Sequence, residues 1–164
     1  MNPARWALGA LLVALGAAAP RTARAQDAEP LAIVVNRNNP VSEISLADLR
    51  RVFRGQRTRW TNGRRVTLVM RSPGAPERAT ILRSVCGLDE EEYRRTFMQA
   101  VFGGQTSEIP KTLSSTNGVL RFVYNVPGAI GYVRARDVDA SVKTLRVDGR
   151  LPGEPGYGLA VSTQ

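Results

Sequence analysis

LAIVVN, residues 31–36, is an unbroken apolar run of strand length, which is typical of a strand that is covered on both faces. Ser45 follows as a candidate helix N-cap, and the apolar residues behind it share one helical face, namely Leu46, Leu49, Val52 and Phe53. A second apolar run, VTLVM at residues 66–70, predicts another strand. Because the order is strand, helix, strand, we expect a right-handed parallel crossover and an α/β fold.

The rest of the chain continues this alternation of helices and strands. One helix is expected from Pro76 until Gly87, and another after the N-cap Asp89, with a buried stripe of Phe97, Met98, Val101 and Phe102. A short helix should follow SSTNG (114–118), and strands should form at 129–133 and 142–147. Gly131, in the middle of a strand, is typical of a close approach by backbone or ligand. We therefore expect a sheet of three to five strands, mixed or mainly parallel, flanked by helices.

The first 25 residues have the pattern of a secretory signal peptide. They contain a basic start at Arg5, an apolar run over residues 6–19 and the small-x-small cleavage site Ala23-Arg24-Ala25. The apolar run is shorter than the roughly 20 residues that a membrane-spanning helix needs. We expect cleavage after Ala25, a periplasmic or otherwise secreted protein, and one domain over residues 26–164.

The charge and the composition exclude several classes of function. The formal net charge of +9 includes Arg5, Arg21 and Arg24 of the leader, which leaves +6 for the remaining chain. This excess is moderate, and the motifs and interleaved aromatic residues of nucleic-acid-binding proteins are missing, so we expect no nucleic acid partner. The sequence has no histidine, which excludes Ser-His-Asp and Cys-His catalysis and histidine-ligated zinc.

The remaining chemically active residues have simple structural interpretations. Cys86 is the only cysteine, so no intrachain disulfide can form, and its apolar neighbours favour a buried residue over a reactive thiol. The acidic residues 90–92 lie in the first turn of a predicted helix, where carboxylates usually favour the helix dipole rather than bind a metal. We expect no enzyme, no catalytic residue, no metal and no cofactor.

Several of these pieces together resemble the phosphate-binding substrate-binding proteins of ABC importers, which belong to the type 2 periplasmic binding protein class. The pieces occur in the family's order at similar spacing: LAIVVN, SLADLRRVFRG (45–55) with Trp60 after it, the strand ending in Arg71-Ser72, PGAIGYV (127–133) and VKTLRVDG (142–149). A full member has two α/β lobes that close on the ligand and needs a much longer chain. The resemblance therefore implies a single lobe of the type 2 periplasmic-binding-protein-like fold over residues 26–164.

The resemblance also implies a candidate ligand site after the second strand. The family's loop reads Arg-Ser-x-Gly-Ser-Gly-Thr, and its arginine, hydroxyls and helix-start N–H groups bind phosphate. Arg71, Ser72 and Gly74 match this pattern, whereas Ala75, Pro76 and Glu77 remove two hydroxyls and one N–H and add a negative charge. At about 5 Å and an effective dielectric of about 20, that charge costs about 3 kcal/mol against a monoanion. This cost matches or exceeds the roughly 1.5–3 kcal/mol of one charge-assisted hydrogen bond, so tight phosphate binding is not expected.

Three alternatives stay open at the level of the sequence. Arg71 either forms an ion pair with Glu77 or remains available to another ligand, such as an organic acid or a carboxylate of a partner. Ser114 and Ser115 either donate to an anion at the start of the next helix or serve as a plain N-cap. Trp60, with arginines on both sides, either forms an exposed recognition patch or packs over the first helix.

The resemblance implies an exported, non-catalytic protein that binds a solute or anion through a degenerate phosphate loop. Phosphate or another small anion would be its ligand, and a membrane permease or another envelope protein its partner. The tentative ligand-binding residues are Arg71, Ser72, Gly74, Ser114 and Ser115. The alternative is an envelope protein–protein interaction module that has lost ligand binding. The sequence does not determine the oligomeric state.

Overall fold

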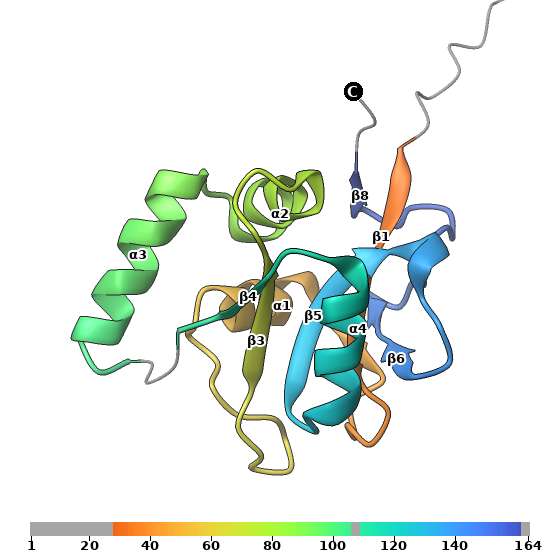
Figure 1. Cartoon of the computed structure of the whole chain (residues 1–164), viewed down its shortest axis with the longest axis horizontal. Coiled ribbons are helices and arrows are strands. Elements are labelled where there is room, and N and C mark those ends of the chain that lie inside the picture. Colours follow the sequence, from red (N-terminus) through yellow and green to blue (C-terminus); the bar gives the residue numbers. More distant parts are fainter. Residues whose placement is uncertain (1–27, 106–108, 162–164) are drawn as a thin grey trace, which may run out of the picture.

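Six strands form one mixed sheet in the computed structural model, which describes residues 28–105 and 109–161 (Figure 1). The strand order is β4-β3-β5-β1-β6, and β8 also pairs with β1. The bounds are β1 (Glu29–Asn36), β3 (Thr67–Arg71), β4 (Lys111–Leu113), β5 (Ala129–Arg134), β6 (Val142–Thr144) and β8 (Ala160–Val161). A separate parallel pair joins β2 (Glu43–Ile44) to β7 (Arg146–Val147). The predicted mixed α/β fold is confirmed, and the sheet exceeds the expected three to five strands because of short strands at its periphery.

The direction of the strands corrects one expectation. Strand β3 runs parallel to β4 and β5, whereas β1 runs antiparallel to β5, β6 and β8. Strand β5 lies between β1 and β3, so the predicted parallel crossover from the first strand to the second is wrong. A strand that is buried on both faces has the same apolar pattern in either direction, and the distant partner β5 decides the arrangement.

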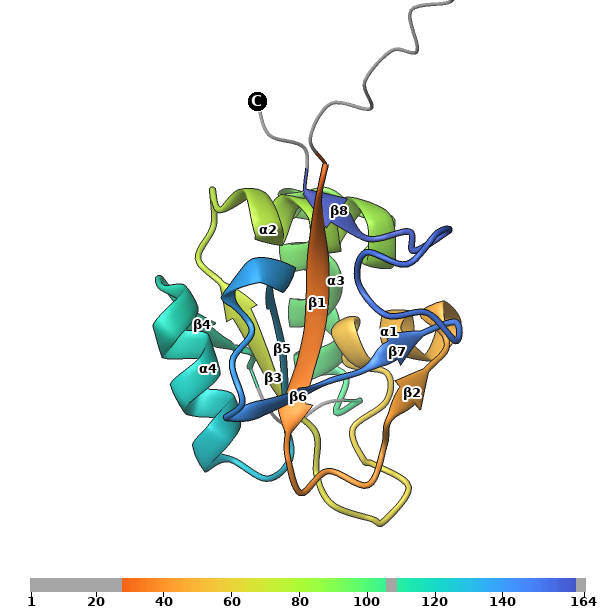
Figure 2. The same cartoon turned by 90° about the vertical axis from the view of Figure 1, so that its right-hand side faces the viewer.

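Helices cover both faces of the sheet (Figures 1 and 2). One face is covered by α1 (Leu46–Phe53), by α2 (Pro76–Thr80) with its π-helical continuation η1 (Ile81–Cys86), and by α3 (Glu90–Phe102). The other face is covered by α4 (Thr116–Asn125), whose Val119, Leu120 and Val123 pack on β1, β3 and β5. A short 3₁₀ helix, η2 (Ala135–Asp137), follows β5. The core therefore consists of two apolar layers, one on each side of the sheet.

Local capping explains where several helices begin. The Ser45 hydroxyl accepts a hydrogen bond from the Asp48 N–H at 3.0 Å, as its N-cap position requires. Asp89 and Glu92 form a reciprocal capping box at the start of α3. These two helix starts confirm the sequence-based expectation.

The buried face of α3 differs from the predicted stripe. Tyr93, Phe97 and Ala100 are buried, but Met98 is 39% exposed and Phe102 is 82% exposed. Periodicity correctly places residues on shared faces of this helix, yet α3 lies at the periphery beyond β4 and only part of its apolar surface is covered (Figure 1). Across the residues that the structure describes, no helix is long and apolar enough to cross a membrane.

Candidate functional site

The two predicted anion-binding segments meet at the carboxyl ends of β3 and β4. These strands are parallel neighbours with Arg71 opposite Leu113, and the Ser72 N–H donates to the Leu113 carbonyl at 3.0 Å. The chain then leads from β3 to α2 and from β4 to α4 (Figure 1). Ser72 and the Ser114-Ser115 pair therefore lie on adjacent loops at the carboxyl ends of β3 and β4, which we call the anion edge. Open α/β sheets bind ligands at the carboxyl ends of their strands.

Arg71 reaches across this edge to the start of α4. Its Nη1 donates to the Thr116 hydroxyl at 3.0 Å. Its Nε is buried and has no hydrogen-bond partner within residues 28–105 and 109–161. A buried guanidinium N–H without a partner is costly, so this side chain retains capacity for an acceptor. Thr116 is absent from the predicted site residues, although its position directly after a candidate N-cap serine was a usable signal.

The backbone of Arg71 is held from two other elements. Its N–H donates to the Tyr132 hydroxyl of β5 at 2.9 Å, and its carbonyl accepts a hydrogen bond from Arg78 Nη1 at 3.0 Å. Arg78 in turn binds both carboxylate oxygens of Glu90 on α3, at 2.7 and 2.6 Å. Strand β5 and helix α2, whose Arg78 is held by Glu90 of α3, thus fix the point from which the Arg71 side chain extends.

Glu77 does not form the ion pair with Arg71 that one interpretation of the sequence proposed. Its Oε1 accepts from Arg134 Nε at 2.6 Å, and Arg134 also binds Glu29 at 2.7 Å. The Glu77 side chain is only 9% exposed. Burial raises the pKa of the Glu77 carboxyl, but the hydrogen bond from Arg134 and the nearby positive charges outweigh it, so that this pKa lies below its ordinary value.

The Glu77–Arg134 pair changes the electrostatics of the loop. A carboxylate that is paired with a guanidinium presents far less net charge to an approaching anion than an unpaired one. The like-charge cost expected from the sequence applies to an unpaired Glu77. Arg134 therefore removes much of the penalty that argued against an anion at this edge.

The loop between β3 and α2 is open and has few donors of its own. Gly74 adopts a left-handed conformation with φ of 87° in an exposed turn, and the Ala75 N–H donates to the Ser72 carbonyl at 3.2 Å. Ala75 occupies the N-cap of α2 without a side-chain oxygen, and Pro76 follows it without an N–H. Hydroxyl donors at this edge therefore come from Ser72 and from the α4 side.

Ser114 and Ser115 differ in what they contact. The Ser115 hydroxyl caps α4 and accepts from the Gly118 N–H at 3.1 Å, which is the plain N-cap interpretation. Ser114 is exposed one residue earlier, directly after β4. The edge thus brings together Arg71, Ser72, Ser114 and Thr116, while Gly74 lies further along the β3–α2 loop.

The other candidate residues have structural roles. Trp60 is 3% exposed, lies in the core cluster with Val52 and Phe53, and donates its indole N–H to the Gly128 carbonyl at 2.9 Å, so it packs rather than forming an exposed patch. Cys86 is buried, and burial raises the pKa of its thiol to about 12. Among the described residues, no group of acidic, cysteine or histidine side chains is arranged to hold a metal ion.

Comparisons with known proteins agree with this architecture. The family model of the PBP superfamily domain matches residues 28–160. A protein from Clostridium perfringens, assigned as a phosphate ABC transporter substrate-binding protein and solved with bound phosphate, has a TM-score of 0.67 and 20% identity, covering 83% of this chain and 54% of its own. An ABC-type phosphate transport receptor from Vibrio cholerae has a TM-score of 0.65 and 22% identity, covering 81% of this chain and 54% of its own.

PstS from Borrelia burgdorferi gives a similar match, with a TM-score of 0.65 and 13% identity over 82% of this chain and 55% of its own. At these identities the likeness shows a shared fold. The chain spans about half the length of the solved proteins it matches.

Proposed function

This chain belongs to the PBP superfamily, and we propose that it is an exported, non-catalytic protein that binds a small anion at the edge formed by β3, β4 and α4. Arg71 would supply the charge, while Ser72, Ser114 and Thr116 would supply hydroxyl groups. Relative to the phosphate loop that the sequence resembles, positions 75–77 contribute no hydroxyl, so the loop is degenerate. Phosphate, sulfate and small carboxylates share the chemistry that this set of donors recognises.

One observation carries the proposal: Glu77 pairs with Arg134, and Arg71 instead extends to Thr116 with its buried Nε unpartnered in the described structure. A guanidinium held at the carboxyl ends of parallel strands, next to a helix N-terminus, favours an oxyanion through charge-assisted hydrogen bonds and the helix dipole. Arg134 neutralises the carboxylate of Glu77, which would otherwise repel the anion.

A thermal-shift screen with phosphate, sulfate and small carboxylates tests this function. An anion at 100 times its dissociation constant stabilises the fold by about 2.7 kcal/mol, which raises Tm by several degrees. Arg71→Ala should abolish the rise. Arg83→Ala, which removes the same charge from an exposed position on η1, should keep it. The proposal is contradicted if no anion raises the Tm of the wild-type protein, or if the Tm of Arg71→Ala rises by the same amount.

The second candidate function is an envelope interaction module that has lost ligand binding. Met98, Phe102 and Ile109 favour it, because these large apolar side chains are 39%, 82% and 72% exposed. A membrane permease or another envelope protein would then be the partner. This candidate would be favoured over the first if no anion raised Tm and if a partner protein bound at a mapped surface of the chain.

Export is part of both candidates and rests on residues 1–25, which lie outside the described residues. We propose that cleavage after Ala25 leaves a single substrate-binding-protein-like domain over residues 26–164. Mass spectrometry of the protein recovered from an expressing bacterial host should give a chain that begins at Gln26. A chain that retains its first residues would contradict the proposed signal peptide.

A further inference from the structure

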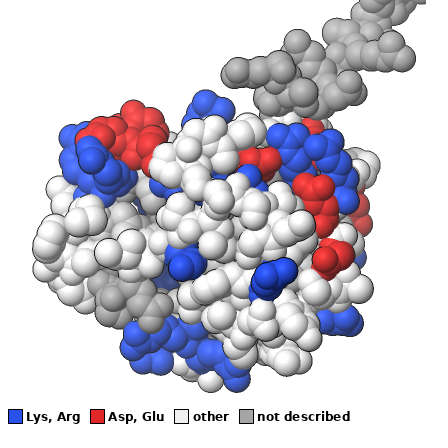
Figure 3. Space-filling view, viewed as in Figure 1, with Lys and Arg blue, Asp and Glu red and all other residues white. Residues whose placement is uncertain are grey.

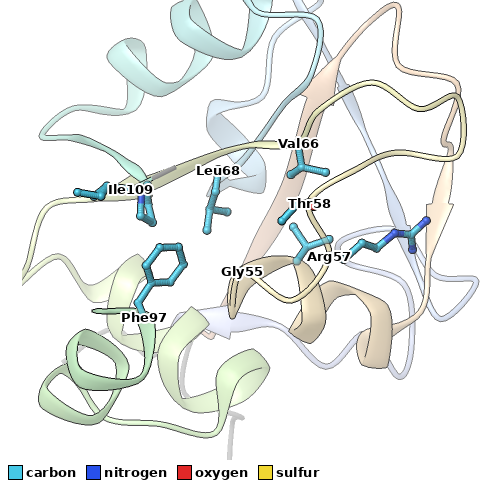
Figure 4. A pocket seen from close by; sticks show the side chains of 9 residues that line it. Gly55, Arg57, Thr58, Val66, Leu68, Phe97 and Ile109 are labelled. Carbon is cyan, nitrogen blue, oxygen red and sulfur yellow. The ribbon is translucent and has the colours of Figure 1, made fainter. Parts of the chain in front are cut away.

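Two adjoining hollows form an apolar trough beside the edge strand β4. The larger, about 220 Å³, lies between α3 and β4. Its lining is mainly apolar, with Pro73, Tyr93, Phe97, Met98, Ile109 and Pro110, and also includes Arg78, Glu90, Arg94 and Thr112. The smaller shares Phe97, Ile109 and Pro110 and continues to Leu68, Val66 and Gly55. Phe97 and Leu68 project toward one another there (Figure 4). The trough thus runs from the N-terminal half of α3 to the loop that follows α1.

Large apolar side chains are exposed at the trough and on the nearby part of α3. Met98 is 39%, Ile109 72% and Phe102 82% exposed, and all three belong to α3 or to the segment just before β4. The surface over the C-terminal part of α3 carries no charged residue in the view of Figure 3. Exposed apolar side chains that gather at a hollow are typical of an interaction site.

The edge of the sheet beside this trough has backbone groups available for pairing. Strand β4 is the outermost strand next to β3. Its Leu113 carbonyl faces β3, where it accepts from the Ser72 N–H. Because successive residues of a strand face opposite sides, the N–H and C=O of Thr112 face the open edge. An extended peptide can add a strand to such an edge.

The charge at one end of the trough indicates the chemistry of the occupant. Arg57 lines the smaller hollow and is paired with Asp48 at 3.5 Å, and the same loop carries the exposed residues Arg59 and Arg64. In Figure 3 this loop forms a region of positive charge below the uncharged surface. Lys111 adds an exposed positive charge on β4 itself. A segment with carboxylates at this end complements the surface.

We propose that the trough between α3 and β4 docks an extended, apolar segment of a partner protein, which adds a strand to the open edge at Thr112 and places carboxylates against Arg59 and Arg64. The main-chain bonds supply affinity, and apolar side chains enter the larger hollow, because the smaller one, at about 20 Å³, has room only for a water molecule. This surface adjoins the anion site at Pro73 but includes none of its proposed ligand residues, and it gives the second candidate function a partner of defined chemistry.

Fluorescence polarisation with synthetic peptides tests the proposal on the purified protein. The probe is a labelled decapeptide that alternates Val or Leu with Thr and ends in two glutamates. The first matched probe ends in two lysines, and the second carries N-methyl groups on alternate backbone nitrogens of the glutamate peptide. We expect saturable binding of the glutamate peptide and at least tenfold weaker binding of both matched probes.

Protein variants locate the binding surface. Met98→Asp and Thr112→Pro should each weaken the glutamate peptide at least tenfold, because they place a charge in the trough and remove the outward N–H. Tyr124→Asp, a control at an exposed aromatic residue of α4, should leave binding unchanged. Circular dichroism checks the fold, and the N-methylated probe tests strand addition without altering the protein.

Three results would overturn the proposal. The first is the absence of saturable binding by the glutamate peptide. The second is equal binding of the N-methylated or lysine-ended probe. The third is a wild-type dimer in sedimentation velocity that Met98→Asp dissociates, since a second copy of the chain would then occupy the trough. Because Met98→Asp leaves the anion edge intact, the anion-induced thermal shift should persist in it, so the two proposals fail independently.

Discussion

Glu77 shows how one distant contact changes the meaning of a loop. In the sequence it stands six residues after Arg71, in the position where a resembling phosphate loop has threonine. In the structure it binds Arg134, which is 57 residues away, and this pairing leaves Arg71 to contact Thr116. The acidic residue therefore ties the start of α2 to the end of β5 and does not occupy the anion edge.

Glu77→Gln should remove an acid-sensitive part of the stability. The pKa of the Glu77 carboxyl is lowered in the folded state, so its contribution is present above the ordinary glutamate pKa of about 4.3 and is lost as the pH falls through the lower folded value. We expect a loss of about 1–2 kcal/mol at pH 7, since Arg134 keeps its second partner, Glu29.

Urea unfolding at pH 7 and pH 3 measures this effect. The wild type should lose more stability on acidification than Glu77→Gln does. Glu43→Gln, the same change at an exposed carboxylate of β2, should behave like the wild type. Identical pH dependence in Glu77→Gln and the wild type would show that the Arg134 pair adds no pH-dependent stability.

The residues of this site could be selected from the sequence, but their contacts could not. Arg71, Ser72, Ser114 and Ser115 each follow a strand or precede a helix, which is local information. The Glu77–Arg134 pair depends on where β5 lies in the sheet, and local sequence does not contain that position. Thr116 could have been selected by its position after an N-cap serine, but its contact with Arg71 exists only because β3 and β4 are neighbours.

The contact of α4 with β5 depends on Gly131. A Cβ at this position would lie 3.0 Å from Val119 Cγ1 and 3.3 Å from Val69 Cβ. The sequence predicts a close approach at Gly131, and in the structure the closely packed element is helix α4 of this chain. Gly131→Ala should destabilise the protein by about 1–3 kcal/mol, because the neighbouring valines must move in a packed layer.

Thermal or urea unfolding of Gly131→Ala checks this packing. Gly158→Ala is the matched control, because a Cβ there has no neighbour within 4 Å, and its cost should be below that of Gly131→Ala. If the two variants were equally stable, α4 would not pack as closely on β5 as described.

The sequence predicts where helices begin better than it predicts which helix faces are buried or which strands are neighbours. Ser45 and Asp89 cap helices through contacts three residues away, so the local sequence contains the information. The exposure of Met98 and Phe102 depends on how far α3 extends past the sheet, and the separation of β1 from β3 depends on β5. Both are properties of the assembled sheet, which periodicity does not describe.

The molecule as a whole resembles one lobe of a larger architecture. It spans about half of each solved protein that it matches, and the family model matches its residues 28–160. The anion edge lies at the carboxyl ends of β3 and β4, and the apolar trough lies along β4 and α3. We propose these two surfaces as separate sites for a small solute and for a protein partner.

A titration of the ¹⁵N-labelled protein with phosphate, sulfate and small carboxylates, followed by ¹H–¹⁵N NMR, tests the anion site most directly. For at least one anion, the amide signals of residues 72, 74 and 114–118 should shift together and saturate, and Arg71→Ala should abolish these shifts. An absence of saturable shifts, or saturable shifts confined to other parts of the chain, would contradict an anion site at the β3–β4 edge.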